Sequence, residues 1–190
     1  FGTHPLEIGA AHIALKTDGP SIRTATTRAL TFDGRSSTSI AAGSIVLSDA
    51  VALDLPALGH LAIDMYLPDD NWATQSPATG LRAAWTTNYL SASGNHSGKN
   101  DMPVKATLQS WIFLARVEVT APAATPVVVT LGDSITEGYG STTDTDRRWP
   151  DVLASRLRDE FGNSAPAVLN VAISGNRLLR GNDGAFGVIS

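Results

Sequence analysis

Ser134 is the side chain in this 190-residue sequence whose type and surroundings are best suited to chemistry. It follows Gly132 and Asp133, directly after the apolar run at residues 127–131. A short β-branched run that stops at a glycine is typical of a strand buried on both faces of a sheet. Open α/β sheets place their chemistry just beyond the carboxyl ends of such strands. A serine hydroxyl can attack a carbonyl carbon, so the pattern predicts nucleophilic chemistry at Ser134.

Gly175 is the second residue that the pattern singles out, because it follows another apolar run at residues 167–172. If the two runs are parallel neighbouring strands, they end at the same sheet edge, roughly 4.8 Å apart. Ser134 and Gly175 are then expected within one substrate's width of each other. The oxyanion formed by attack on a carbonyl needs preorganised N–H donors, and a glycine allows the closest approach. The backbone N–H groups of Ser134 and Gly175 are therefore candidate donors.

The segment between these runs is predicted to be one α-helix, because its apolar residues recur at helical spacing. These residues are Trp149, Val152, Leu153, Leu157 and Phe161. Pro150 and Asp151 suit the first turn of a helix, and Gly162 suits its end. A strand, a helix and a second strand at these distances predict parallel strands joined by a right-handed crossover.

Two motifs now carry a resemblance: GDSITEG at residues 132–138 and NVAISGN at residues 170–176. In this order and spacing they resemble the nucleophile block and the oxyanion-glycine block of the GDSL/SGNH hydrolase superfamily. The resemblance covers residues 127–190 and implies a flavodoxin-like, three-layer α/β fold. It also implies that Ser134 is the nucleophile and that the N–H groups of Ser134 and Gly175 form part of an oxyanion hole.

The same resemblance implies a serine esterase or lipase that needs no metal and no organic cofactor. The expected substrates are esters of small acyl groups on carbohydrates or lipids, either as small molecules or within a polysaccharide.

The family's remaining two blocks are not matched. Asn182, in a Gly-Asn-Asp run, resembles in composition the block that supplies a third oxyanion donor, but it lies only seven residues after Gly175 and is interpreted as a loop residue. No D-x-x-H motif is present, and all four histidines precede Ser134. About 64 residues cannot cover both faces of a parallel sheet. The chain is therefore expected to be a fragment with an incomplete hydrolase domain, inactive in isolation because it lacks the general base.

Residues 1–120 are predicted to be all-β, because apolar and polar residues alternate in short runs separated by turn residues. The predicted strands are residues 61–67, 81–89 and 111–119, with shorter ones at 12–15, 29–32 and 44–47. This pattern favours a β-sandwich or jelly roll. Residues 121–126 are small and bracketed by prolines, which indicates a linker before a hydrolase domain at 127–190. The N-terminal region is similar to the accessory domain of some secreted bacterial family members, which implies an extracellular protein.

Composition excludes several classes of function. The net charge of −4 and the lack of a basic run argue against nucleic acid as a partner. No stretch approaches the ~20 apolar residues of a membrane-spanning helix. The sequence has no cysteine, which excludes disulfides and thiolate zinc sites. The oligomeric state is left open.

Several other residues allow alternative assignments. Asp144 and Asp146 suggest a calcium loop, but the downstream Glu of such a loop is missing, which favours a solvated loop. Asp133 is expected to hold its turn by hydrogen bonding. His96 is expected in an exposed loop, with a place in a substrate cleft as the alternative. The four tryptophans, Trp72, Trp85, Trp111 and Trp149, suit core or interdomain contacts better than sugar stacking.

One competing function stays open. The chain also fits a secreted carbohydrate-binding or adhesion module whose hydrolase part is incomplete and inactive. Ester hydrolysis that depends on Ser134 separates the two hypotheses.

Overall fold

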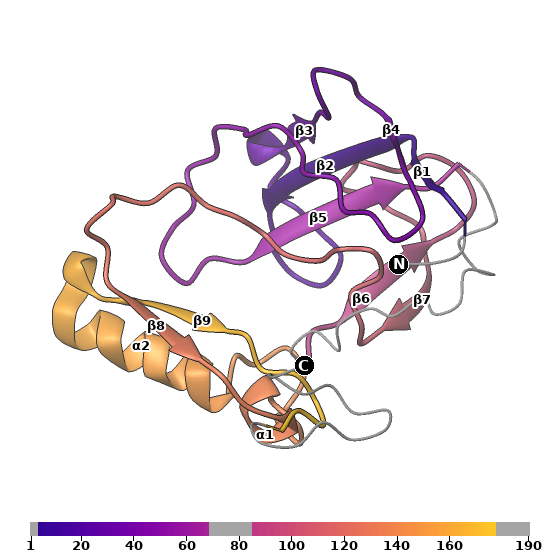
Figure 1. The fold of residues 1–190 in the computed structure, drawn as a ribbon. Coiled ribbons are helices and arrows are strands. Elements are labelled where there is room, and N and C mark those ends of the chain that lie inside the picture. The colour runs from indigo at the N-terminus through magenta and orange to yellow at the C-terminus, as the bar shows by residue number, and fades with distance from the viewer. Residues whose placement is uncertain (1–3, 69–84, 178–190) are drawn as a thin grey trace. The chain divides into compact units, whose positions relative to one another are not determined.

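The computed structural model describes residues 4–68 and 85–177 (Figure 1). The chain divides into two compact units. The first contains Phe1–Gly80 and Asn88–Leu108, and the second contains Leu81–Thr87 and Gln109–Ser190. The predicted domains, 1–120 and 127–190 with a linker at 121–126, stay a prediction. None of the described helices is long and apolar enough to cross a membrane.

The first unit is built from short antiparallel strands. They are β1 (Leu6–Ile8), β2 (Ala10–Leu15), β3 (Arg28–Leu30), β4 (Thr38–Ile40), β5 (Leu61–Tyr66), β6 (Asn88–Ser91) and β7 (Val104–Leu108). One 3₁₀ turn, Thr24–Thr26, precedes β3. The strands form a three-stranded sheet in the order β3-β2-β5 and two pairs, β1-β4 and β6-β7. This agrees with the predicted all-β region, while the sandwich or jelly-roll arrangement stays a prediction.

Apart from Pro150 in the second unit, the buried apolar side chains of the described residues gather at the start of the first unit. They are Leu6, Ile8, Ala11, Ile13, Ala14, Leu15 and Ile22. In β2 the residues paired with β5 include Ala11 and Ile13, which alternate with the half-buried His12. The alternation expected of a half-buried strand holds over the first four residues of β2, whereas Ile13, Ala14 and Leu15 are all buried.

Several predicted strands are confirmed, and two are wrong. β5 confirms the strand at 61–67, and β2 and β3 overlap those at 12–15 and 29–32. The strand at 111–119 is wrong, because Phe113 has a φ of 62° that interrupts extended backbone. The strand that precedes this segment is β7, which ends at Leu108 and pairs with β6. The strand at 44–47 is also wrong: Ile45 and Leu47 are exposed, so the apolar alternation buries nothing there.

The strand predicted at 81–89 is only partly testable, since residues 81–84 lie outside the described residues. In the described part, Trp85 has a φ of 56° and strand β6 begins at Asn88, so an extended strand through Trp85 is wrong.

The second unit is a strand–helix–strand arrangement. Its elements are β8 (Val127–Thr130), α1 (Ser134–Glu137), α2 (Trp149–Phe161), a 3₁₀ turn (Gly162–Ser164) and β9 (Ala167–Asn170). β8 and β9 are parallel, and the register runs from Val127 opposite Ala167 to Thr130 opposite Asn170. Helix α2 has the predicted bounds, with Pro150 in its first turn and Gly162, at a φ of 55°, at its C-terminal end. The predicted α/β unit is confirmed to this extent, and the three-layer fold stays a prediction.

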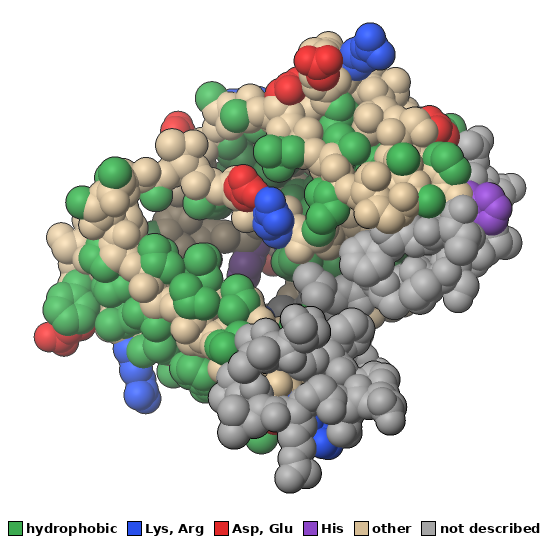
Figure 2. Space-filling model, viewed as in Figure 1, with side chains coloured by type: hydrophobic (Ala, Val, Ile, Leu, Met, Phe, Trp, Pro, Cys, Tyr) green, Lys and Arg blue, Asp and Glu red, His purple; other side chains and the backbone are tan. Residues whose placement is uncertain are grey.

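The two faces of the β8–β9 sheet differ. Helix α2 lies along β9, and Thr130, which points to the covered face, is only 5% exposed (Figure 1). On the other face Val127 and Val129 are 51% and 57% exposed, and Leu169 and Val171 are exposed beside them. Figure 2 shows these hydrophobic side chains gathered over the sheet. The prediction that the first strand is buried on both faces is therefore wrong, because among the described residues only α2 covers this sheet.

Candidate active site

The turn after β8 presents Ser134 as the first residue of the short helix α1. Asp133 is the N-cap, and its carboxylate Oδ1 accepts a hydrogen bond of 3.0 Å from the N–H of Ile135. This agrees with the expectation that Asp133 holds the turn. The carbonyl oxygen of Ser134 accepts hydrogen bonds from the N–H groups of Gly138 and Tyr139, at 3.0 and 2.7 Å. The backbone on both sides of Ser134 is therefore tied down.

Two glycines allow this turn to close. A Cβ on Gly132 would lie 2.5 Å from the hydroxyl oxygen of Thr136, so only a glycine lets α1 fold back onto the strand end. Gly138 has a φ of 124°, and a Cβ there would lie 2.4 Å from Cδ of Arg148. The GDSITEG sequence thus forms a tightly packed turn, and a side chain in place of either terminal glycine would clash with its neighbours.

The pairing of the two strands continues beyond their last regular residues. The N–H of Val171 donates to the carbonyl of Thr130 at 3.0 Å, and the N–H of Ile173 donates to the carbonyl of Gly132 at 3.1 Å. A turn follows in which the N–H of Asn176 donates to the carbonyl of Ile173 at 2.9 Å. Gly175 is the third residue of this turn and has a φ of 79°, the left-handed value that this position favours in a type II turn.

The structure therefore brings the two sequence-predicted residues to the same edge of the sheet. Gly132 and Ile173 are joined by a hydrogen bond. Ser134 lies two residues beyond Gly132, and Gly175 lies two residues beyond Ile173. Ser134 is half-buried and Gly175 is exposed. Within the described residues, the N–H groups of Ser134 and Gly175 donate to no protein acceptor.

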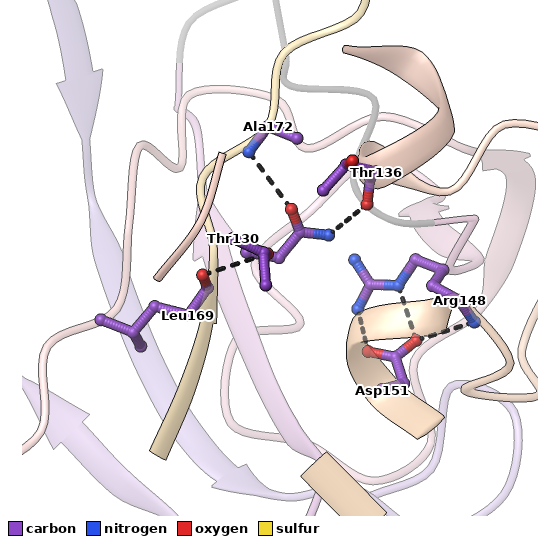
Figure 3. Close-up of polar contacts among 7 residues, drawn as sticks. Thr130, Thr136, Arg148, Asp151, Leu169 and Ala172 are labelled. Carbon is purple, nitrogen blue, oxygen red and sulfur yellow. Dashed lines mark hydrogen bonds and ion pairs between the residues drawn. The ribbon is translucent and has the colours of Figure 1, made fainter. Parts of the chain in front are cut away.

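Asn170, the last residue of β9, links the two motif segments. Its hydrogen bonds are the dashed lines that end at the labelled Thr136 and Ala172 in Figure 3. Its side-chain Nδ2 donates to the carbonyl of Thr136 in α1 at 2.8 Å, and its Oδ1 accepts from the N–H of Ala172 at 3.2 Å. In the sequence, Asn170 stands out only as part of a motif. The signal that could have found its role is one amide side chain within an otherwise apolar strand.

The start of α2 carries an ion pair that also contacts this turn. Nε and Nη2 of Arg148 donate to the two carboxylate oxygens of Asp151, each at 2.7 Å, and both side chains are about one-fifth exposed (Figure 3). The N–H of Arg148 also donates to Asp151 at 3.2 Å. Because the stem of Arg148 packs against Gly138, the pair joins α2 to the end of the nucleophile turn. The place of Asp151 at the helix start was predictable from the sequence, whereas its partner was not.

Residues 85–87 contact the loop between α1 and α2. The N–H and hydroxyl of Thr87 donate to the carboxylate of Asp144 at 2.7 and 2.5 Å, and the N–H of Asp144 donates to the carbonyl of Trp85 at 2.9 Å. The rings of Trp85 and Tyr139 meet edge to face at 5.8 Å. The carboxylate of Asp144 thus has a structural partner within the chain, and no group of three or more His, Asp or Glu side chains in the described residues is placed to hold a metal ion.

All four histidines belong to the first unit. One of them, His12, lies opposite Asp64 on β2 and β5, and Ser97 lies between the two side chains. Nδ1 of His12 is 2.7 Å from the hydroxyl oxygen of Ser97, which donates to Asp64. In a serine triad the histidine lies between the serine and the acid. Here the serine is in the middle and its proton is directed at the carboxylate, so the cluster anchors a loop and does not form a triad.

Two other polar side chains, those of His96 and Asn176, make local contacts. Nε2 of His96 lies 3.3 Å from the carbonyl oxygen of Ser93, and the side chain is half-buried instead of exposed. Asn176 accepts a hydrogen bond from the N–H of Arg177 at 3.1 Å, which is a turn role. Asn182 and Trp72 lie outside the described residues.

Comparison with known proteins adds one finding. No curated protein matches the chain. Residues 130–188, a stretch that contains Ser134, Gly175 and the elements between them, match the model of the GDSL-like Lipase/Acylhydrolase family. This part of the chain is therefore similar to GDSL-like lipases and acylhydrolases, which supports ester hydrolase activity in general.

Proposed function

We propose that this chain carries the nucleophile and two oxyanion donors of a serine ester hydrolase. Ser134 supplies the nucleophilic hydroxyl, and the backbone N–H groups of Ser134 and Gly175 bind the oxyanion. The observation that carries the proposal is the hydrogen bond from Ile173 to Gly132, which extends the parallel ladder and brings both motif segments to one sheet edge. The family match over residues 130–188 supports the same chemistry.

The reaction has two steps. The hydroxyl oxygen of Ser134 attacks the ester carbonyl carbon, the carbonyl electrons move onto its oxygen, and the two N–H groups stabilise that charge. When the tetrahedral species collapses, the alcohol leaves with the proton from the serine and an acyl-serine remains. Water then attacks the acyl carbon, releasing the carboxylic acid and restoring Ser134. Residues 127–190 contain no histidine, so the proposal assigns no general base to them.

The proposed substrates are carbohydrate or lipid esters of small acyl groups, and the proposed location is extracellular. Both rest on the resemblance to secreted bacterial members of the family. The net charge of −4 and the absence of a basic run in the sequence make a polyanionic substrate the less favourable choice.

Hydrolysis of p-nitrophenyl acetate by the full-length protein tests the proposal. Ser134→Ala is expected to lower kcat by about 10⁴-fold or more, since the nucleophile is removed. Ser155→Ala, an exposed serine on α2, is the matched control and should leave kcat unchanged. Labelling with a serine-reactive phosphonate followed by mass spectrometry should modify Ser134 in the parent protein.

Two outcomes would overturn the proposal. Unchanged turnover in Ser134→Ala would remove Ser134 from the mechanism. A full-length protein that hydrolyses no ester and still binds polysaccharide would favour the carbohydrate-binding or adhesion module.

A further inference from the structure

Asn170 occupies a position where the two halves of the proposed site meet. Its side chain is half-buried and uses both ends of its amide. The donor end holds the carbonyl of Thr136, two residues after Ser134 in α1. The acceptor end holds the N–H of Ala172, three residues before Gly175. One side chain therefore contacts both segments that carry the proposed oxyanion donors (Figure 3).

The strand ladder does not make these contacts redundant. The N–H groups of Val171 and Ile173 bond to the carbonyls of Thr130, at the end of β8, and of Gly132, just beyond it. The N–H of Ala172 points away from that ladder, and the carbonyl of Thr136 lies in α1 beyond the end of the strand. Only a side chain that both donates and accepts can satisfy the two groups together. An amide does so, whereas an ionised carboxylate lacks the donor and an aliphatic side chain lacks both.

Thr136 is held from a second direction as well. Its side chain packs against Gly132 so closely that a Cβ there would lie 2.5 Å from the threonine hydroxyl oxygen. The contact with Gly132 sets how near α1 approaches the end of β8. The hydrogen bond from Asn170 sets how α1 is placed relative to β9, a distance that the Gly132 contact does not control.

We propose that Asn170 is a positioning residue that fixes the spacing between the N–H groups of Ser134 and Gly175. This inference rests on the proposed function, because the spacing matters only if both groups bind one oxyanion. Misplacing a catalytic group by about 1 Å can cost on the order of 100-fold in rate. The pairing of β8 with β9 is enough to maintain the fold, and the Asn170 amide sets the distance between the N–H groups of Ser134 and Gly175.

The test compares three substitutions in the full-length protein. Asn170→Asp keeps the shape and the acceptor and removes the donor, and Asn170→Ala removes both. Thr130→Val is the matched control, because Thr130 lies in the same sheet and is 5% exposed. The substitution removes the hydrogen bond from the Thr130 hydroxyl to the carbonyl of Leu169, a bond that does not involve α1. For each variant, kcat and KM for p-nitrophenyl acetate are measured together with the midpoint of thermal unfolding.

Both Asn170 variants are expected to lower kcat by about 10- to 100-fold and to leave KM within about 2-fold. Thr130→Val should lower the unfolding midpoint with little change in kcat. If Asn170→Ala fails to fold, Asn170→Asp decides the question at a temperature well below its own midpoint. A loss of kcat in Asn170→Asp no larger than in Thr130→Val would overturn the inference.

The pH profile of Asn170→Asp gives a readout that a purely structural role would not produce. A protonated carboxyl group regains an O–H donor, so the ratio of variant to parent kcat should rise as the pH falls toward about 4. Asp133 and Glu137 at the two ends of α1 and the Arg148–Asp151 pair at the start of α2 are shared by both proteins, so the ratio removes their contribution. A ratio that does not change with pH would count against positioning by the amide.

Failure of this inference can be told apart from failure of the proposed function. If Ser134→Ala abolishes activity while the Asn170 variants keep their kcat, the nucleophile stands and Asn170 has no positioning role. If Ser134→Ala keeps full activity, the proposed function fails, and the inference about Asn170 fails with it.

Discussion

The β3-β2-β5 sheet of the first unit and the β8-β9 sheet of the second unit are held together in different ways. In the first unit, β2 is the central strand between β3 and β5, and it carries the buried apolar side chains of Ala11, Ile13 and Leu15. In the second unit, β8 and β9 leave Val129 and Leu169 exposed on one face. Apart from Pro150 in the first turn of α2, the buried apolar side chains of the described residues belong to the first unit.

Polar bridges replace apolar burial at the end of the second sheet. The turn that carries Ser134 is held by the Asp133 cap, by the amide of Asn170 and by the Arg148–Asp151 pair behind Gly138. Hydrogen bonds are directional, so they can fix a turn to within fractions of an ångström, which nonspecific apolar contacts do less well. The comparison indicates that apolar burial stabilises the first unit, whereas directional polar contacts position the turn that carries Ser134 in the second unit.

The largest effect that follows from this contrast concerns core truncation. Ile13→Ala, at a side chain that is 9% exposed, is expected to lower the free energy of unfolding of the first unit by about 2–5 kcal/mol. The matched control, Val129→Ala on the open face of β8, should cost roughly 0.5 kcal/mol or less. Chemical denaturation, monitored by the hydrogen exchange of each unit, measures the loss in free energy of unfolding for both variants. Equal costs would show that the face of β8 is covered in solution and would remove the contrast.

A smaller effect is expected from the ion pair of the second unit. Arg148→Met keeps the stem that packs on Gly138 and removes the two charged hydrogen bonds to Asp151. The expected loss is about 1–2 kcal/mol in the free energy of unfolding of this unit, reduced from the value for a fully buried pair because both groups are partly exposed. Arg156→Met, at an exposed position of the same helix, is the control. A loss in Arg148→Met no larger than in the control would show that the pair is not a structural bridge.

The sequence predicted the local parts of the second unit well. The bounds of α2 and the parallel pairing of β8 with β9 follow from signals within each segment: a helical apolar stripe, Pro150 in the first turn and Gly162 at the end. The edge of the sheet to which Ser134 and Gly175 belong follows from this topology. These features were predictable because short-range spacing decides them.

Features that depend on distant partners were not predictable. Alternation at residues 111–119 looks like that of β5, but no burial supports it, and Phe113 adopts a left-handed φ that interrupts it. The hydrogen bonds of Thr87 to Asp144 join residues 57 positions apart. The amide of Asn170 reaches 34 positions back to Thr136. A single sequence carries no signal for such pairs, because neither partner is unusual by itself.

The smallest predicted effect tests whether a polar bridge also contributes in the first unit. The carboxylate of Asp49 accepts hydrogen bonds from the hydroxyl of Thr31 at 2.6 Å and from the N–H groups of Gly34 and Asp33 at 2.8 and 3.2 Å. These bonds, that from Thr31 first, lower the pKa of Asp49 below its ordinary value of 3.8, against an opposing effect of desolvation. Since the ionised form favours the folded state, the contribution is full above about pH 3.8 and is lost as the pH falls through that value toward the lower pKa of the folded state.

Asp49→Asn should therefore be slightly less stable than the parent protein at pH 6, and the difference should shrink when thermal unfolding is repeated at pH 3. Asp54→Asn, at an exposed position of the same segment, is the control for the loss of one surface carboxylate. The effect is expected to be small because water screens the charge of an exposed carboxylate. A difference that stays constant from pH 6 to pH 3 would assign the role of Asp49 to shape instead of charge. In that case the contrast would sharpen: among the polar contacts compared, a charged bridge would contribute only at the turn that carries Ser134.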